Sequence, residues 1–482
     1  MQLLNVFFIY LSSLGTLSLA DTNESTLTSR QILPNSFKPP PVFKNVHLLR
    51  NINLEKGYAR ESINVVVENL DSKPQDTYFL PFRAESIQKI GGLEVRDKKD
   101  PEKPAFKSEV VEYDPNSSTQ FYRVTLPAPL TPSSQLTLSI IYNVISDFTP
   151  LPATIGQQDK QYILHKFSLF VPSAYHTSKQ KTKIKFPSAD VPDFTSDPER
   201  QGTTFNYGPF EDKPAGAEEE ASVRYEFTKP IIHATLLERD IEISHWGGNL
   251  AAEERYWLTH MGAPLSAQFS RVQWAVSQHY PMPNSALKEL KIPLLGGSAD
   301  AYFTDDIGNV STSRFRSTPR EANLEIKPRY PLFGGWNYSF RVGWNNNLDR
   351  FVRKTNTGST YVLRVPFLEG PKMSEGVSYG KVEFQVVLPE GATNVQYECP
   401  IPLISSESSS HKSFMDTLGR TTLKLTAINV VDQSRDQDVI VTYDYTLMAA
   451  LRKPATIFGG VLAVFVTAWA VSNLDISIAK PT

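Results

Sequence analysis

Two apolar segments, one near each end of the chain, constrain what the rest of it can fold into. Residues 3–11 are apolar except for Asn5, and Ser18-Leu19-Ala20 is a small-x-small pattern typical of a signal-peptidase site. Residues 455–474 include no ionisable side chain, and a helix of that length is about 30 Å long, matching the hydrocarbon core of a membrane. We therefore expect a signal peptide at 1–20, a transmembrane helix at 454–474 and a short cytosolic tail at 475–482.

The charges around the second segment oppose this orientation. Arg452 and Lys453 precede it and only Lys480 follows it, so the positive-inside rule would place the carboxyl terminus outside. A signal peptide commits the chain to translocation before the second segment is made, and we give it the greater weight. Residues 21–453 are then expected on the lumenal or extracellular side.

Composition excludes one class of partner and one kind of stabilisation. The chain has 49 Lys and Arg against 51 Asp and Glu, so no basic field exists to hold nucleic acid through its phosphates. Its single cysteine, Cys399, cannot form a disulfide within the chain, so apolar cores must hold the domains together. Cys399 is a nucleophile, an intermolecular bridge or a buried inert thiol, and we favour the last.

Hydrophobicity alternates with a period of two residues in most of the chain. Clear examples are 136–145, 381–386 and 439–445, and 35 prolines and 25 glycines separate such runs. This pattern is typical of half-buried antiparallel strands. It predicts a mainly β protein with two antiparallel β-sandwich domains, followed by one transmembrane helix.

Local composition predicts the domain boundary and the irregular segments. The acidic stretch with Pro and Gly at 211–221 is expected to be a linker or a long loop, and we place the junction near residue 230. The two domains are then 21–230 and 231–453. The Ser-rich stretch 405–413 is predicted to be a loop, and 285–290 a short helix.

The Asn-x-Ser/Thr pattern of N-glycosylation occurs four times on the expected lumenal side. Asn23 is the poorest candidate because it lies three residues from the expected cleavage point. The candidate glycosylated residues are Asn309, Asn337, Asn116 and Asn23.

No catalytic, cofactor-binding or metal-ligating residue is predicted. Gly376-Val377-Ser378-Tyr379-Gly380 matches G-x-S-x-G, but a strand rather than the required helix is expected after it, so we interpret it as a turn. Asp436 and Asp438 form a D-x-D triplet that we interpret as a solvated turn before a strand. The sequence contains no H-E-x-x-H zinc motif.

Aromatic and small residues suggest contact surfaces rather than chemistry. Trp246, Trp336 and Trp344 could stack on sugars or anchor partners, although packing in a core or turn is the preferred reading for each. Within the apolar span, small residues recur every four positions and would allow close approach of another helix. That contact face is Gly459, Ala463 and Thr467.

Three long motifs, in one order along the chain, resemble signatures of the ribophorin I family. They are 239–247 (RDIEISHWG), 302–313 (YFTDDIGNVSTS) and 328–336 (PRYPLFGGW). Weaker similarities lie at 207–210, 388–391 and 474–478, and the amino-terminal half agrees mainly in strand pattern. One departure is Gly248, inserted where the family commonly has Trp-Gly-Asn, and another is the short tail.

The resemblance implies a non-catalytic subunit of the endoplasmic-reticulum oligosaccharyltransferase, whose chemistry lies in a separate polytopic subunit. It also implies two sandwiches related to the non-catalytic amino-terminal domain of zinc aminopeptidases. Expected partners are the other subunits, including the polytopic catalytic subunit, nascent glycoprotein substrates and the endoplasmic-reticulum membrane. Asn309 matches the family motif and is our first choice for an occupied glycan.

Two other functions stay open at this point. One is a membrane-anchored lumenal peptidase or glycosidase, although no pair of carboxylates has a defined role. The other is a cell-surface binding or adhesion protein, which the lack of disulfides disfavours.

Overall fold

The computed structural model describes residues 32–33, 37–100, 103–113, 118–277, 279–280, 282–356, 358–412 and 416–473. These residues belong to one compact unit, Gln31–Thr482. The predicted signal peptide at 1–20, the predicted tail at 475–482, Asn23 and Asn116 lie outside the described residues.

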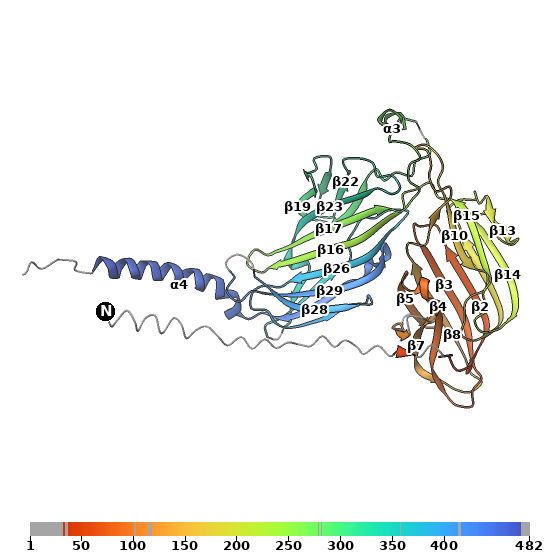
Figure 1. Ribbon diagram of the computed structural model, residues 1–482. Helices are drawn as coiled ribbons and strands as arrows, with labels where there is room; N and C mark the ends of the chain where they lie inside the picture. Colours follow the sequence, from red (N-terminus) through yellow and green to blue (C-terminus); the bar gives the residue numbers. More distant parts are fainter. Residues whose placement is uncertain are drawn as a thin grey trace, which may run out of the picture. The chain divides into compact units, whose positions relative to one another are not determined.

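The amino-terminal sandwich packs one large sheet against two small ones (Figure 1). The large sheet has the order β13-β14-β11-β2-β3-β8-β5, and the small sheets are β1-β6-β7-β4 and β12-β15-β10-β9. The strands are β1 Ile32–Leu33, β2 Phe43–Asn53, β3 Ala59–Asn69, β4 Gln75–Arg83, β5 Ile90–Asp97, β6 Lys107–Tyr113, β7 Thr119–Leu130, β8 Gln135–Val144, β9 Thr149–Pro150, β10 Tyr162–Ser168, β11 His176–Lys185, β12 Asp193–Phe194, β13 Glu199–Gln201, β14 Thr204–Lys213 and β15 Glu220–Glu226, with the short helix α2 Ala84–Ile87.

The carboxy-terminal sandwich has the same plan. Its large sheet has the order β20-β19-β23-β17-β16-β26-β29-β28, and its small sheets are β18-β22-β21 and β24-β25-β30-β27. The strands are β16 Ile232–Ser244, β17 Asn249–His260, β18 Leu290–Leu295, β19 Ala299–Asp305, β20 Gly308–Asn309, β21 Arg314–Ser317, β22 Glu321–Ile326, β23 Asn337–Asn347, β24 Val352–Lys354, β25 Thr360–Pro366, β26 Val377–Val387, β27 Thr393–Glu398, β28 Ser405–His411, β29 Arg420–Val431 and β30 Asp438–Asp444. The helices are α3 Arg271–Ser277, η1 Leu348–Arg350, η2 Asp432–Asp436 and α4 Leu447–Ser472.

The two large sheets repeat one arrangement of strands. In each, the first long strand (β2 or β16) pairs antiparallel with the next one (β3 or β17) and parallel with a strand from much later in the chain (β11 or β26). The outer neighbours β8 and β14 of the first sheet correspond to β23 and β29 of the second, and all four pair antiparallel. The alternation of hydrophobicity predicted the strands but carried no sign of these parallel pairs.

Each sandwich has its own apolar core. One cluster of buried side chains runs from Phe43 to Ile231 and the next from Ile232 to Tyr445. The change of core at Ile231 and Ile232 lies next to the expected junction near 230, and the division into 21–230 and 231–453 stays a prediction. The acidic stretch 211–221 instead covers the end of β14, a turn and the start of β15, so it connects two strands of the first sandwich.

Five local predictions can be compared with the structure, of which three are confirmed and two are wrong. The alternating runs appear as β8, β26 and β30. The Ser-rich stretch is not a loop, because 405–411 pairs along its whole length with β29. The helix expected at 285–290 is absent from these described residues, since Leu287 pairs its backbone with Leu332 and Leu290 begins β18.

The last described helix is α4, which is long and apolar enough to cross a membrane. It begins at Leu447, before the expected span at 454–474, and includes Pro454. Its amino terminus is capped by Thr446, whose hydroxyl accepts a hydrogen bond from the Ala449 amide at 3.2 Å. In Figure 1 it leaves the carboxy-terminal sandwich at the opposite end from α3.

Candidate functional site

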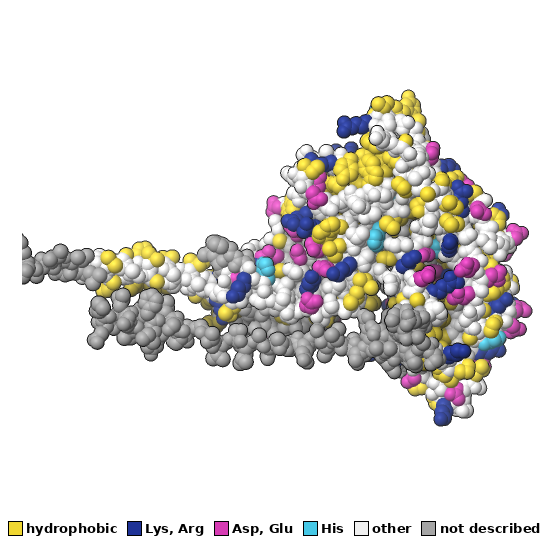
Figure 2. All heavy atoms as spheres, in the orientation of Figure 1, with side chains coloured by type: hydrophobic (Ala, Val, Ile, Leu, Met, Phe, Trp, Pro, Cys, Tyr) yellow, Lys and Arg dark blue, Asp and Glu magenta, His cyan; other side chains and the backbone are white. Residues whose placement is uncertain are grey.

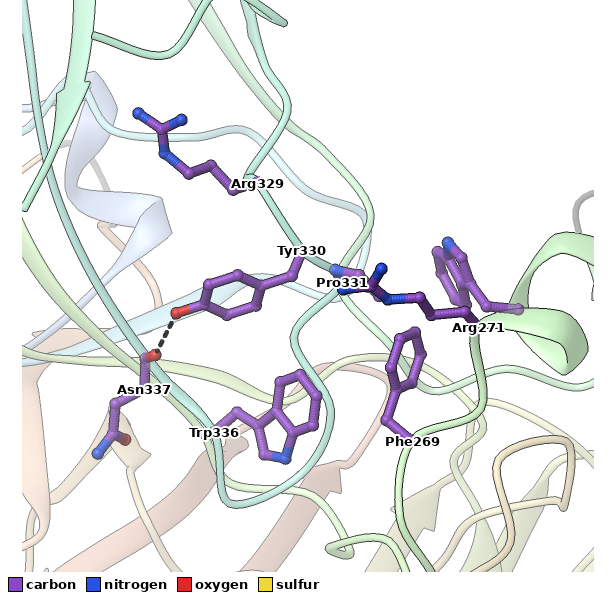
Figure 3. A pocket seen from close by; sticks show the side chains of 8 residues that line it. Phe269, Arg271, Arg329, Tyr330, Pro331, Trp336 and Asn337 are labelled. Carbon is purple, nitrogen blue, oxygen red and sulfur yellow. Dashed lines mark hydrogen bonds between the residues drawn. The ribbon is translucent and has the colours of Figure 1, made fainter. Parts of the chain in front are cut away.

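A pocket of about 720 Å³ opens on the carboxy-terminal sandwich. Two segments supply it, the loop and short helix α3 after β17 and the segment that leads into β23. The lining residues are Phe269, Arg271, Trp274, Arg329, Tyr330, Pro331, Trp336 and Asn337 (Figure 3).

Aromatic rings form most of the pocket wall. Phe269 contacts Trp336 edge to face, with ring centroids 5.9 Å apart, and Tyr330 meets Trp336 in the same way at 5.9 Å. Trp274 from α3 packs on Phe269 at 6.3 Å. Figure 3 shows Arg271 extending toward Pro331 beside these rings, so one guanidinium borders the aromatic surface.

Glycines allow the backbone to approach closely enough to build this wall. A Cβ at Gly334 would collide with the carbonyl group of Ala263, and an isolated bridge joins Pro264 to Gly334. Gly335 adopts φ 77°, a conformation that favours glycine, and its amide donates to the His260 carbonyl at 2.8 Å. These contacts turn the chain so that Trp336 faces the pocket.

An ion pair holds the rim of the pocket. The Arg329 Nε atom lies 2.5 Å from Oδ2 of Asp305, a half-buried residue at the end of β19 whose side chain is 3% exposed. Burial would raise the pKa of Asp305, but the hydrogen bonds from Arg329 and from the amides of Ile307 and Gly308 outweigh it and lower that pKa. Tyr338 also donates to the Asp305 carboxylate at 3.2 Å, so the carboxylate stays ionised and organises the rim.

Both described sequons lie at this rim. Asn309 is exposed on β20, and its carbonyl accepts a hydrogen bond from Arg329 at 3.0 Å. Asn337 is exposed at the first position of β23 and lines the pocket. The fold therefore brings together two predicted glycosylation sites that are separated in the sequence, and their occupancy stays a prediction.

The pocket lies at the end of the sandwich away from α4. β17 and β23 are antiparallel, with Thr259 opposite Asn337 at one end and Asn249 opposite Asn347 at the other. The turn that joins β16 to β17 lies at the second end, beside α4. At about 3.4 Å per residue, the length of β23 separates the pocket from that turn by more than about 30 Å.

Half of the residues in this wall carried no prediction from the sequence. Of the three tryptophans that it singled out, Trp336 lines the pocket, Trp344 is 2% exposed in the core and Trp246 is 65% exposed beside α4. Phe269 and Trp274 were not singled out. The sequence signal for them is a pair of large aromatic residues five positions apart in the segment 266–279.

The G-x-S-x-G match lacks the geometry of a nucleophile elbow. The Ser378 hydroxyl of the G-x-S-x-G match is hydrogen-bonded to His233 Nδ1 at 2.9 Å, but Ser378 is buried within β26 rather than at a strand-to-helix turn. Burial lowers the pKa of His233. In the described ranges no group of three or more His, Cys, Asp and Glu is placed to hold a metal ion.

The remaining predicted residues are held in structural contacts or face outward. The Cys399 side chain packs against the core, and burial raises the pKa of its thiol, which keeps it protonated. Asp438 of the D-x-D triplet pairs with Arg364 at 2.6 Å. Gly459, Ala463 and Thr467 are exposed along α4, where the contact face stays a prediction.

The arrangement suits binding rather than covalent chemistry. Aromatic faces and guanidinium groups can contact the apolar faces of sugars, the side chains of extended peptides or both. The space-filling view in Figure 2 also shows apolar side chains gathered on the carboxy-terminal sandwich near α3.

Comparison with known proteins gives a consistent result along the chain. Residues 43–472 match the family model described as Ribophorin I. Subunit 1 of dolichyl-diphosphooligosaccharide–protein glycosyltransferase from Schizosaccharomyces pombe is 30% identical over 428 residues, which are 86% of this chain and 92% of that protein. Subunit 1B of the same enzyme from Arabidopsis thaliana is 30% identical over 442 residues, covering 90% and 94%.

Solved structures add nothing to this comparison. Native yeast LTA4 hydrolase matches with a TM-score of 0.28 and 13% identity, over 38% of this chain and 29% of that one. A score this low carries no argument, so the expected relation of the sandwiches to an aminopeptidase domain stays a prediction.

Proposed function

The chain belongs to the ribophorin I family, and we propose that it is a non-catalytic, single-span subunit of the endoplasmic-reticulum oligosaccharyltransferase. That complex transfers a dolichol-linked oligosaccharide to asparagine in Asn-x-Ser/Thr sequences of nascent proteins. The observation that carries the proposal is the match to the family over residues 43–472. Relatives named as subunit 1 support it, because the alignments cover more than nine-tenths of two of them.

The proposed role is binding and assembly, with the chemistry left to a polytopic partner subunit. Ser378 is buried, and the Cys399 thiol stays protonated because burial raises its pKa. Both observations support the proposal that the chain has no catalytic nucleophile of its own. A subunit of this kind increases the effective concentration of a nascent chain near the catalytic site. The aromatic pocket is the surface that we assign to such contacts.

The proposed topology is type I in the endoplasmic-reticulum membrane. In this topology α4, which is long and apolar enough, supplies the span, and both sandwiches are assigned to the lumen. The aromatic pocket, at the end of the sandwich away from α4, then faces the lumen rather than the bilayer. Nascent glycoproteins in the lumen could reach it there.

Affinity purification of the intact protein in mild detergent tests membership of the complex. We expect a polytopic subunit to be recovered with it in stoichiometric amount, identified by mass. A matched preparation in which 454–474 is replaced by an unrelated apolar sequence shows how much of that recovery depends on the span. If the intact protein were recovered without any polytopic subunit, the proposal would be refuted.

A separate assay tests the non-catalytic role. The purified chain is incubated with a dolichol-linked oligosaccharide and an acceptor peptide, and we expect no transfer until the partner subunits are added. Saturable transfer by the chain alone, abolished by Ser378→Ala, would show that it is an enzyme. That outcome leaves the membership test unaffected.

A further inference from the structure

The helix α4 is longer than the hydrocarbon core that it is proposed to cross. Its 26 residues extend over about 39 Å at about 1.5 Å per residue, against about 30 Å of hydrocarbon. With the span at 454–474, the first turns of α4, from Leu447 to Lys453, project toward the sandwich. Counted from Ala455 at about 1.5 Å per residue, Lys453 lies about 3 Å and Leu447 about 12 Å above the hydrocarbon edge. These turns therefore cross the layer of lipid headgroups, which is about 5–8 Å thick on each side, and reach a few ångströms beyond it.

The hairpin turn between β16 and β17 meets α4 at that level. The Trp246 Nε1 atom donates a hydrogen bond to the Ala450 carbonyl at 2.8 Å. Ala450 precedes Ala455 by five residues, which places it about 7.5 Å above the hydrocarbon edge. Although this contact holds it, the indole of Trp246 is still 65% exposed.

Other apolar side chains are exposed within one helical turn of Ala450 on α4 or on the adjoining loop. Leu447 is 74% and Met448 80% exposed on one face of α4, whereas Ala449 and Ala450 pack against the core of the sandwich. Leu418, on the loop before β29, is 61% exposed. The four residues Trp246, Leu418, Leu447 and Met448 are called the basal apolar surface below.

Polar contacts fix this surface to the helix. The Lys453 Nζ atom lies 2.5 Å from Oδ1 of Asp416, in the same loop as Leu418. The Leu418 amide donates to Glu390 at 2.7 Å, and His245 Nε2 lies 2.8 Å from the Tyr443 hydroxyl. The surface is therefore held rigidly against the first turns of α4.

We infer that the basal apolar surface lies at the outer boundary of the headgroup layer of the bilayer, with the Trp246 indole inserted into that layer, so that the carboxy-terminal sandwich rests on the membrane. An indole has an apolar body and one polar N–H, and tryptophan is enriched at this depth for that reason. Arg452 and Lys453 lie at the level of the lipid phosphates, which long basic side chains near a helix end can reach. The position of α4 in the membrane, on which this inference rests, follows from the proposed function.

Quenching of tryptophan fluorescence by brominated lipid tests the inference. The full chain is placed in nanodiscs of phosphatidylcholine, alone and in its purified complex, with bromine near the headgroup end or deep in the acyl chains. The contribution of Trp246 is the difference between wild type and Trp246→Phe. We expect shallow bromine to quench it more than deep bromine does, and Trp336→Phe, which alters a residue in the pocket, to leave the quenched signal unchanged.

A second measurement does not depend on altering Trp246. In a Cys399→Ser background, Leu418→Cys carries a spin label, with Ile307→Cys at the exposed turn between β19 and β20 as control. We expect oxygen to relax the label at 418 more than a water-soluble nickel complex does, and the reverse at 307. Equal exposure of both labels to water, or no quenching of Trp246 in the complex, would overturn the inference while leaving membership of the complex untouched.

Discussion

The side chains of Arg329 and Asp305 form an ion pair of 2.5 Å that joins two of the family motifs at the rim of the aromatic pocket. Asp305 closes the strand β19, and Arg329 lies in the segment that leads into β23. Because Arg329 also donates to the carbonyls of Gly308 and Asn309, one guanidinium organises the turn that presents the Asn309 sequon.

Removing the charge of Asp305 should destabilise this rim. Asp305→Asn removes the charged acceptor of hydrogen bonds from Arg329, Tyr338 and two backbone amides. We expect a loss of about 1–3 kcal/mol in the free energy of unfolding. Asp438→Asn is the control, since its partner Arg364 is 72% exposed and such surface pairs contribute about 0–1 kcal/mol. Thermal unfolding of the full chain, followed by tryptophan fluorescence, compares them, and equal effects would contradict the prediction.

The buried charge cluster around Arg239 should be far more sensitive. Arg239 pairs with Glu254 and, at 2.7 Å, with Glu369, and its own side chain is 1% exposed. Arg239→Met leaves buried carboxylates without compensation, so we expect a loss of about 3–5 kcal/mol. The double variant Arg239→Met, Glu254→Leu should recover part of that loss in urea unfolding. A double variant less stable than Arg239→Met would show that the charges stabilise the core.

Acidification should weaken the loop that supports the pocket wall. His260 Nδ1 accepts from the Gly262 amide at 3.0 Å and Nε2 lies 2.7 Å from the Ser285 carbonyl, so the buried ring is neutral. Burial lowers the pKa of His260 to about 4, against about 6.5 in an unfolded chain. The unfolded state thus binds the proton first, and up to about 3 kcal/mol of stability is lost as pH falls from about 6.5 to about 4.

The substitution His260→Gln separates this contribution from that of the other histidines. We expect the variant to lose less stability than wild type over the same fall in pH, whatever its stability at neutral pH. The measurement is the unfolding midpoint in urea at a series of pH values. If stability depended on pH in the same way in both proteins, His260 would not contribute to the loss of stability at low pH.

The two exposed sequons should carry glycans. Asn309 and Asn337 both lie at the open rim, where an oligosaccharide is accommodated without displacing core side chains. Asn309→Gln and Asn337→Gln should each remove one glycan and so increase the electrophoretic mobility by one step. After endoglycosidase treatment, each variant and the wild type should migrate alike. Asn323→Gln, at an exposed asparagine outside a sequon, is the control. A mobility unchanged by either sequon substitution would refute occupancy of that residue.

The single thiol should react slowly in the folded protein. Cys399 packs against the core, and burial raises the pKa of its thiol, so little thiolate is present at neutral pH. Alkylation at pH 7.5 should therefore be much slower in the native than in the urea-unfolded chain. Ser406→Cys in a Cys399→Ser background, at an exposed position of β28, should react at similar rates in both states. Fast native labelling of Cys399 would point to a reactive role.

Local pattern was enough to predict much of the fold. Alternating hydrophobicity predicted β8, β26 and β30, because a residue that faces a core on one side of a sheet repeats every second position. The pattern failed where pairing rather than polarity decides the structure. The Ser-rich β28 is a strand because β29 offers it a full ladder of backbone hydrogen bonds, and Leu287 is extended because Leu332 pairs with it.

The sequence by itself determined the strand-rich class, the apolar span and the family, since each depends on residues close together in the chain. Only the tertiary structure decided which distant residues meet: Phe269 with Trp336, Trp274 with Phe333, and Trp246 with Ala450. The physical reason is that these contacts follow from the pairing of β16, β17 and β23. Strand order and register depend on long-range burial and backbone hydrogen bonds, which no local pattern encodes.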